Sequence, residues 1–219
     1  NDNPLICGSN SGGPTNGPFV AKYDPSGTQL WKKIVTGNAS FDEASAVDAD
    51  AAGNIYVAGR FTSASLNFGT FALANPGSAV LGFIAKFDSA GNALWAQYAG
   101  SRAFDVDVTA DGSSYFTGFH SSTAATLGTN TLPVVSGLDL WIAKFDTDGN
   151  SVWVTNSGTS NNDIARAITH TASGSTYVTG EAGAEIFNNP SFEPKVFIVE
   201  LRSPTTLPQL TIAHTSTDL

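Results

Sequence analysis

The same segment occurs three times along the chain. Residues 19–24 read FVAKYD, residues 83–88 read FIAKFD and residues 141–146 read WIAKFD. Each copy continues through a glycine to a tryptophan that stands seven residues after the aspartate; these tryptophans are Trp31, Trp95 and Trp153, 64 and 58 residues apart. A chain that repeats itself at such an interval is built from tandem copies of one structural unit.

A second segment follows the first in each copy and carries a tyrosine. It reads GNIYVAG at 53–59, GSSYFTG at 112–118 and GSTYVTG at 174–180. Its tyrosines are Tyr56, Tyr115 and Tyr177, and its last residues are Gly59, Gly118 and Gly180. The unit is therefore about 60 residues long, and we interpret the repeated tryptophan, tyrosine and glycine positions as structural.

Within each unit the side-chain pattern has a period of two. Phe19, Ala21 and Tyr23 alternate with Val20 and Lys22, which is typical of a β-strand. The turns DPSG, DSAG and DTDG follow, in which aspartate bonds the local backbone and glycine takes the left-handed conformation. A strand with the tryptophan comes next, a third strand is predicted at 44–50, 103–109 and 165–171, and the tyrosine segment predicts a fourth. The chain should be all-β.

Tandem units of four antiparallel strands are typical of β-propeller blades. We predict a partial β-propeller of about three and a half four-stranded blades, with segments such as 62–82 linking one blade to the next. Residues 1–202 would hold the last strand of a preceding blade, three full blades and one further strand. Residues 203–219 would be a linker and the start of a following β domain, with a strand at 209–214. The remaining blades of the same polypeptide are then expected partners.

The pattern FIAKFDxxGNxxW at 83–95, together with GNIYVAG at 53–59, resembles the bacterial β-propeller repeat family called SBBP. The similarity extends over roughly residues 1–202. It implies a seven-bladed propeller in large secreted or surface-attached bacterial proteins, so the expected location is extracellular or on the cell surface. It implies no catalytic residues, because the shared positions are strand and turn positions.

Two features depart from the family pattern. The second unit is four residues shorter between its second and third strands, and it lacks the aspartate that is Asp42 in the first unit and Asp163 in the third. The fourth copy of the first strand, at 197–201, has Glu200 where the others have lysine. A function that needs every unit to be equivalent is therefore disfavoured.

Composition excludes several classes of partner. The net charge is −9, and ten lysines and arginines spread along an acidic chain cannot form the basic stripe that follows nucleic-acid phosphates. No run approaches the roughly 18 apolar residues of a membrane span. A single cysteine, Cys7, excludes an internal disulfide and a cysteine-based metal cluster.

The best metal candidate is the acidic turn formed by Asp146, Asp148 and Asn150, because alternating oxygen ligands suit calcium. The equivalent turns lack the second carboxylate, so a hairpin turn explains the motif without a metal. The three tryptophans are compatible with an aromatic platform for a ligand, but we prefer the interpretation that they pack between adjacent blades. We predict no cofactor.

No catalytic constellation is evident. The histidines His120, His170 and His214 are far apart in the repeat frame. The carboxylate pairs Asp48 with Asp50 and Asp105 with Asp107 each share one side of a strand, and without a cleft we expect them to be solvated.

We therefore predict a non-enzymatic binding or scaffold module whose ligand is an unknown protein or carbohydrate. The variable segments at 62–82, 119–138 and 181–195 would form its binding face, since recognition usually resides on loops of a rigid scaffold. The alternative is part of a propeller enzyme (a lyase, a glycosidase or a quinoprotein-like protein) with catalytic residues in missing blades or domains. Histidine, arginine and carboxylates clustered at the channel would favour the enzyme. A purely structural spacer is a third possibility.

Overall fold

The computed structural model describes residues 3–11, 15–37, 39, 41–77, 79–121, 125–133, 137–158, 161–182, 196–202 and 209–214. Within these ranges every regular element is a β-strand, and all named strand pairs are antiparallel, which confirms the all-β prediction. Four larger sheets follow one another along the chain, and we name them I to IV.

Sheet I has three strands and sheets II to IV have four each. Sheet I is β1 (Leu5–Asn10), β2 (Gly17–Tyr23) and β3 (Gln29–Ile34); sheet II is β4 (Glu43–Ala49), β5 (Ile55–Phe61), β8 (Leu81–Phe87) and β9 (Ala93–Tyr98). Sheet III is β10 (Arg102–Val108), β11 (Ser114–Ser121), β14 (Leu138–Phe145) and β15 (Ser151–Ser157); sheet IV is β16 (Ile164–His170), β17 (Ser175–Glu181), β18 (Phe197–Arg202) and β19 (Gln209–His214).

Two short hairpins are inserted between the second and third strands of sheets II and III. The first is β6 (Ser65–Asn67) with β7 (Ala72–Ala74), and the second is β12 (Ala125–Leu127) with β13 (Asn130–Leu132). They lie in the variable segments 62–82 and 119–138. The third variable segment, 181–195, falls largely outside the described residues.

The strands are grouped differently from the prediction. We expected the four strands of one sequence unit to form one blade, with residues 62–82 as the link to the next. In the structure β3 ends sheet I and β4 begins sheet II, so each sheet combines the second half of one unit with the first half of the next. Residues 62–82 join β5 to β8 within sheet II, because the inserted hairpin returns the chain to the side of β5. The predicted phase of the unit is wrong.

The C-terminal strand also differs from expectation. Residues 209–214 were predicted to open a following β domain, but β19 pairs with β18 as the fourth strand of sheet IV. The position that holds tryptophan in β3, β9 and β15 therefore falls on this strand, where Thr211 is the register partner of Glu200.

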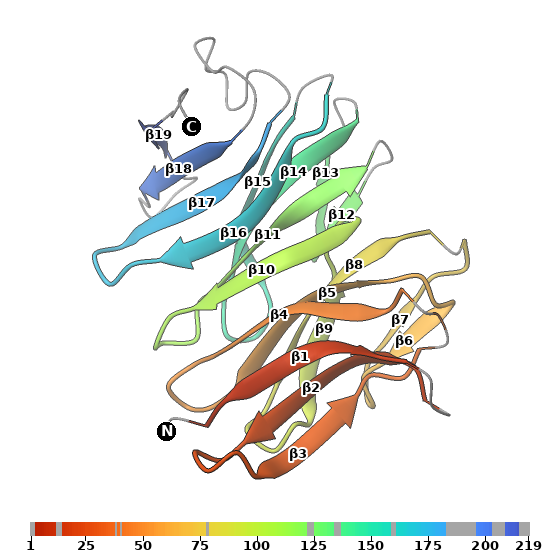
Figure 1. The fold of residues 1–219 in the computed structure, drawn as a ribbon. Helices are drawn as coiled ribbons and strands as arrows, with labels where there is room; N and C mark the ends of the chain where they lie inside the picture. The colour runs from red at the N-terminus through yellow and green to blue at the C-terminus, as the bar shows by residue number, and fades with distance from the viewer. Residues whose placement is uncertain are drawn as a thin grey trace.

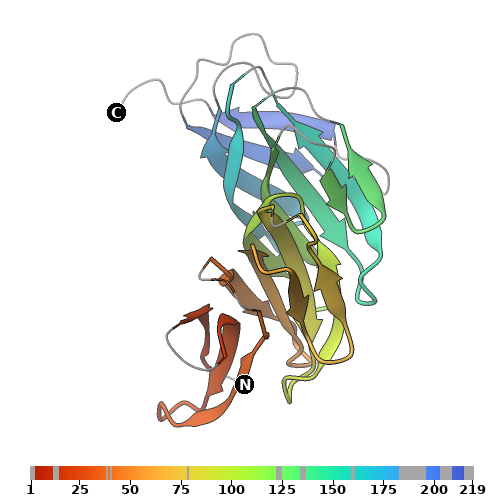
Figure 2. The same ribbon diagram turned by 90° about the vertical axis from the view of Figure 1, so that its right-hand side faces the viewer.

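The four sheets form an open stack along the described part of the chain (Figures 1 and 2). The strand β1 packs against β4, β4 against β10 and β10 against β16, so the first strands of successive sheets lie next to one another. We call β4, β10 and β16 the inner strands. Three clusters of buried apolar side chains fill the three interfaces, one between sheets I and II, one between II and III and one between III and IV.

Candidate functional site

One row of repeated side chains crosses sheet II and faces sheet III. Asp48, Tyr56, Lys86 and Trp95 are direct register partners on β4, β5, β8 and β9, so they lie side by side on the same face. We call this set the docking row. It contains the tyrosine and the tryptophan that define the sequence repeat.

Every member of the docking row is bonded to the backbone of sheet III. Val108 N–H donates to Asp48 Oδ2 at 2.7 Å, and Tyr56 Oη donates to the Gly112 carbonyl at 3.0 Å. Lys86 Nζ and Trp95 Nε1 both donate to the Thr147 carbonyl, at 2.9 and 3.3 Å. In this interface the tyrosine and the tryptophan of the repeat, Tyr56 and Trp95, hold sheet II against sheet III.

The inner-strand carboxylates have the same role in the next interface. Asp105 Oδ2 accepts the Ile168 N–H at 2.9 Å, and Asp107 accepts the His170 N–H. Burial raises the pKa of Asp48 and of Asp105. The expectation of solvated carboxylates is wrong for these groups, because the edge strand of each sheet has outward amides that need an acceptor.

The tryptophan and the glycine of the turn fit together across an interface. Trp95 stacks on Phe145 of sheet III with ring centroids 6.4 Å apart. Gly149 has φ +86°, and a Cβ at this position would lie 2.9 Å from Trp95 Cδ2. Glycine is therefore required there both by the left-handed backbone and by the adjacent indole. The contacts of Trp95 agree with packing between sheets rather than with a ligand platform.

The calcium candidate is accounted for by its own turn. Asp146 Oδ1 accepts the N–H groups of Asp148 and Asn150, at 3.0 and 2.8 Å, and the Asn150 amide donates to Asp146 Oδ2 at 3.0 Å. Burial alone would raise the pKa of Asp146, but the hydrogen bonds from Asn150 and the backbone hold it below its usual value. In the described ranges no group of three or more histidine, cysteine, aspartate or glutamate side chains has the geometry of a metal site.

The structure does not bring the three histidines together. His170 stacks on Tyr115, with ring centroids 4.4 Å apart, and its Nδ1 is 2.9 Å from Thr176 Oγ1. Burial and the neighbouring Lys144 lower the pKa of His170. His214 lies on β19, whose side chains are outside the described part.

His120 forms a buried pair with Asp139. Both side chains are fully buried, Nε2 of His120 lies 4.0 Å from Asp139 Oδ2, and the two are register partners on β11 and β14. Burial lowers the pKa of His120, with a partly offsetting effect of Asp139. The same pair of positions in sheet II holds Phe61 and Leu81. Sequence reasoning noted His120 but missed its partner, because the pairing depends on the β11–β14 register.

A cavity of about 540 Å³ is lined by residues of both inserted hairpins. Both variable segments 62–82 and 119–138 contribute to it, as do the ends of β5 and β9. We call it the loop cavity. Its lining comprises Arg60, Ala74, Ala79, Val80, Leu81, Tyr98, Gly100, Ser101, Phe119, Ser121 and Thr126.

Hydrogen bonds fix the walls of the loop cavity. Tyr98 Oη donates to the Ala74 carbonyl at 2.7 Å, and Gly100 N–H donates to the Thr126 carbonyl at 3.2 Å. Ser121 N–H donates to Ser101 Oγ at 3.0 Å. Each bond joins parts of the chain that are about 20 or more residues apart. The cavity is therefore held by the fold and does not depend on a single loop.

An arginine cluster adjoins this cavity. The cluster contains three of the four arginines of the chain and two glutamates. Glu43, Arg102 and Arg166 lie at or near the starts of the inner strands, and Arg60 and Glu181 lie at the ends of the adjacent strands β5 and β17. Glu43 Oε1 lies 3.1 Å from Arg60 Nε and accepts a hydrogen bond from Arg102. Arg166 Nε is 2.9 Å from Glu181 Oε1.

An aromatic ring joins the halves of the arginine cluster. The guanidinium carbons of Arg102 and Arg166 lie 4.4 and 4.6 Å from the Phe104 ring centroid, within cation–π range. Phe104 in turn packs on Phe119 of the loop cavity, with centroids 5.7 Å apart. Sequence reasoning missed this cluster, since its residues differ between copies. The sequence offered one clue: the chain has only four arginines, and three of them stand at positions where the other copies of the unit have a different residue.

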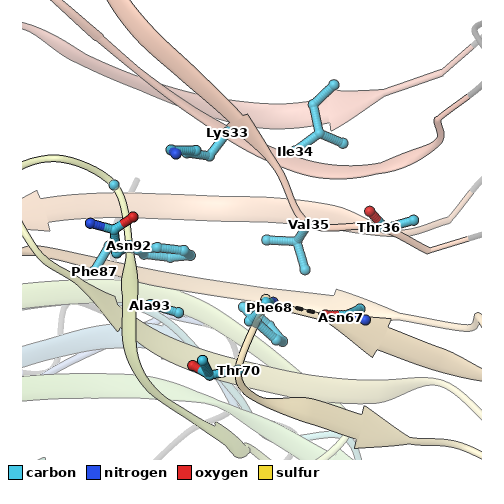
Figure 3. A pocket seen from close by; sticks show the side chains of 12 residues that line it. Lys33, Ile34, Val35, Thr36, Asn67, Phe68, Thr70, Phe87, Asn92 and Ala93 are labelled. Atoms are coloured by element: carbon cyan, nitrogen blue, oxygen red, sulfur yellow. Dashed lines mark hydrogen bonds between the residues drawn. The ribbon is translucent and has the colours of Figure 1, made fainter.

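A second cavity, of about 470 Å³, lies between sheets I and II (Figure 3). Lys33 and Asn92 lie on one side of it, and Phe68 and Thr70 lie on the other. The position equivalent to Lys33 in the next interface is Gln97, whose amide donates to the Gly149 carbonyl across the gap between the sheets. We therefore interpret the cavity in Figure 3 as a less complete interface rather than as a dedicated site.

Comparison with known proteins identifies no family. No family model matches the chain, and no curated protein matches it. Among solved structures, a crystal structure of a protein of unknown function from Bacteroides caccae is similar at 12% sequence identity, over 91% of this chain and 90% of that chain, with a TM-score of 0.26. In the described ranges the structure has no helix with the length and apolar character to cross a membrane.

Proposed function

We propose that this chain is a binding scaffold, which holds a ligand in the loop cavity without transforming it. The observation that carries the proposal is that repeated and non-repeated residues have different roles. The repeated side chains of the docking row bond sheet to sheet. The variable segments and the non-repeated Arg60 build a cavity whose volume is within the range of small-molecule sites.

The proposal includes the fold of the scaffold, which we interpret as part of a β-propeller. Three observations support it: sheets II to IV are four-stranded antiparallel meanders, the inner strands lie next to one another, and each sheet packs face to face on the next. We propose that the sheets are blades of an SBBP-like propeller in a protein of the cell exterior. Protein and carbohydrate ligands on the face formed by the variable segments stay part of the proposal.

The arginine cluster is the observation that favours the alternative, a propeller enzyme. Arginine and glutamate do converge at the inner strands. However, the buried His120 is fully inaccessible and Asp139 is equally buried, so neither contacts a molecule in the loop cavity without rearrangement. Binding without chemistry therefore accounts for the site with fewer assumptions.

The proposal is tested by screening a set of small neutral, cationic and anionic fragments against the ¹⁵N-labelled chain by NMR. We expect amide shifts concentrated at Arg60, Ser101 and Ser121. The exposed Ala79 lines the cavity, so Ala79→Trp should fill it and remove the shifts. Thr70→Trp, at an exposed residue of the cavity in Figure 3, is the matched control and should leave them unchanged. Shifts that are absent, or that persist in Ala79→Trp, contradict the proposal.

A further inference from the structure

We propose that the loop cavity and the arginine cluster form one site for a small organic monocarboxylate with an apolar body. The inference rests on the binding role proposed above and names the class of ligand. Two residues connect the parts: Arg60 lines the cavity and pairs with Glu43, and Phe119 lines the cavity and packs on Phe104.

The charge of the cluster matches a single negative charge. Three guanidinium groups face two carboxylates, Glu43 and Glu181, which leaves one positive charge in a chain of net charge −9. A dianion such as phosphate would exceed this charge and would meet the two glutamates. A carboxylate monoanion balances it, and the planar guanidinium fork suits carboxylate geometry.

Burial strengthens the electrostatic part of the site. The side chains of Arg60 and Arg102 are only 27% and 22% exposed, and Glu43 is 28% exposed. Charges in this environment are screened less by salt than those on an open surface. Arg166 and Glu181, at 44% and 55% exposed, form the outer half of the cluster and contribute less.

The other walls of the cavity are suited to an apolar group. Ala74, Ala79, Val80, Leu81, Tyr98 and Phe119 provide aliphatic and aromatic surface, and Val80 is 44% exposed although it is apolar. Ser101 and Ser121 add hydroxyl groups on the side nearest Phe119, where their Oγ atoms are 3.1 Å apart. An apolar cavity with a few polar groups at one end is the usual form of a site for an amphipathic small molecule.

The test is calorimetric titration of the full chain with 3-phenylpropionate, with its neutral counterpart 3-phenylpropan-1-ol and with inorganic phosphate. We expect the carboxylate to bind and the alcohol and phosphate to bind at least tenfold more weakly. Arg60→Gln should weaken carboxylate binding at least tenfold. Lys33→Gln, which removes the same charge at the cavity of Figure 3, should leave it unchanged.

A second pair of variants keeps the test decisive if Arg60→Gln fails to fold. Val80 is exposed at the rim, so Val80→Glu and Val80→Gln differ only in a charge placed outside the core. Val80→Glu should abolish carboxylate binding, whereas Val80→Gln should retain most of it. Equal binding of the alcohol, binding of phosphate in place of the carboxylate, or equal affinities of the two Val80 variants would overturn the inference.

The two proposals fail separately. If neutral fragments shift the amides of the loop cavity while carboxylates are silent, the ligand class is wrong and the binding role stands. If no fragment of any class shifts them, both are wrong.

Discussion

The interface between sheets II and III and the interface between sheets I and II use the same strand positions, but they are closed to different degrees. In the first, all four members of the docking row bond to the opposite backbone. In the second, the corresponding row is Leu5, Lys22 and Trp31. Its described hydrogen bonding to sheet II is the one from Trp31 Nε1 to the Ser89 carbonyl, at 3.2 Å.

The consequence of this difference is local and is visible as empty space beside the row. Cavities of about 470 and 330 Å³ lie beside Leu5, Lys22 and the β3 strand between sheets I and II, whereas the loop cavity between sheets II and III lies at the hairpin end, away from the docking row. At the corresponding outer position between sheets II and III, Gln97 and Trp95 contact Gly149. The strand pattern alone is therefore enough to stack the sheets, whereas the side chains of the docking row close the space beside them.

The largest expected effect is the loss of unfolding free energy when either of two tryptophans is replaced by alanine. Trp95 is 7% exposed, and Trp95→Ala should lower the free energy of unfolding by about 3–5 kcal/mol, as is usual for a buried aromatic residue. Trp31 is only half-buried, so Trp31→Ala should cost about half as much. Urea unfolding of both variants measures the difference. Equal losses would show that the two interfaces are equally closed.

Replacing the glycines of the turns compares the same two interfaces, with smaller expected losses of unfolding free energy. Gly27 and Gly149 have nearly the same backbone, with φ +85° and +86°, but a Cβ at Gly27 meets no atom within 4 Å. Gly27→Ala should therefore cost about 1–2 kcal/mol, from left-handed strain alone. Gly149→Ala should cost about 1 kcal/mol more, because the indole of Trp95 must also move. Thermal unfolding at matched pH distinguishes the two, and equal melting temperatures would count against interlocking of turn and indole.

The smallest expected effect is a histidine-linked pH dependence at the β11–β14 pair of sheet III, because the equivalent pair of sheet II has no titratable side chain. Burial holds the pKa of His120 below its usual value, so the unfolded chain, in which histidine titrates near 6.5, binds the proton more readily. The stability contributed by neutral His120 is present above that pH and is lost as the pH falls towards the lower folded value. Phe61 and Leu81, which occupy these positions in sheet II, do not titrate and make no such contribution.

Replacing the pair with the residues of sheet II tests this difference. The double variant His120→Phe with Asp139→Leu should have a flatter profile of unfolding free energy between pH 7.5 and about 5. Asp48 and Asp105, whose pKa values burial raises, are unchanged in the variant and provide a common background. Identical slopes for the variant and the original chain would contradict the assignment.

The strands and turns were predictable because they are local. Alternation at 19–23 and the aspartate–glycine turns specify a strand and a hairpin without reference to the rest of the chain. The phase of the sheets was not predictable in this way. Either grouping of the unit gives an antiparallel meander with the same alternation, and the choice depends on how residues 62–82 return beside β5.

The site was predictable only in outline. Residues 62–82 and 119–138 were expected on a binding face, and both do line the loop cavity. The arginine cluster was missed because Arg60, Arg102 and Arg166 occupy three different positions of the unit and lie on three different sheets, so only the packing of one sheet on the next brings them together. The inner-strand carboxylates were assigned to solvent because the sequence does not reveal that an edge amide such as that of Val108 faces them.

Side chains of one sheet satisfy the backbone of the next, and amide hydrogen exchange of Val108 is the sharpest test of this arrangement. Val108 lies on the edge strand β10, and its N–H donates to Asp48 Oδ2 of sheet II at 2.7 Å. We predict that this amide exchanges as slowly as those within the β10–β11 ladder, and that Asp48→Ala makes it fast while Phe116 stays protected. Rapid exchange of Val108 in the unaltered chain would contradict the account.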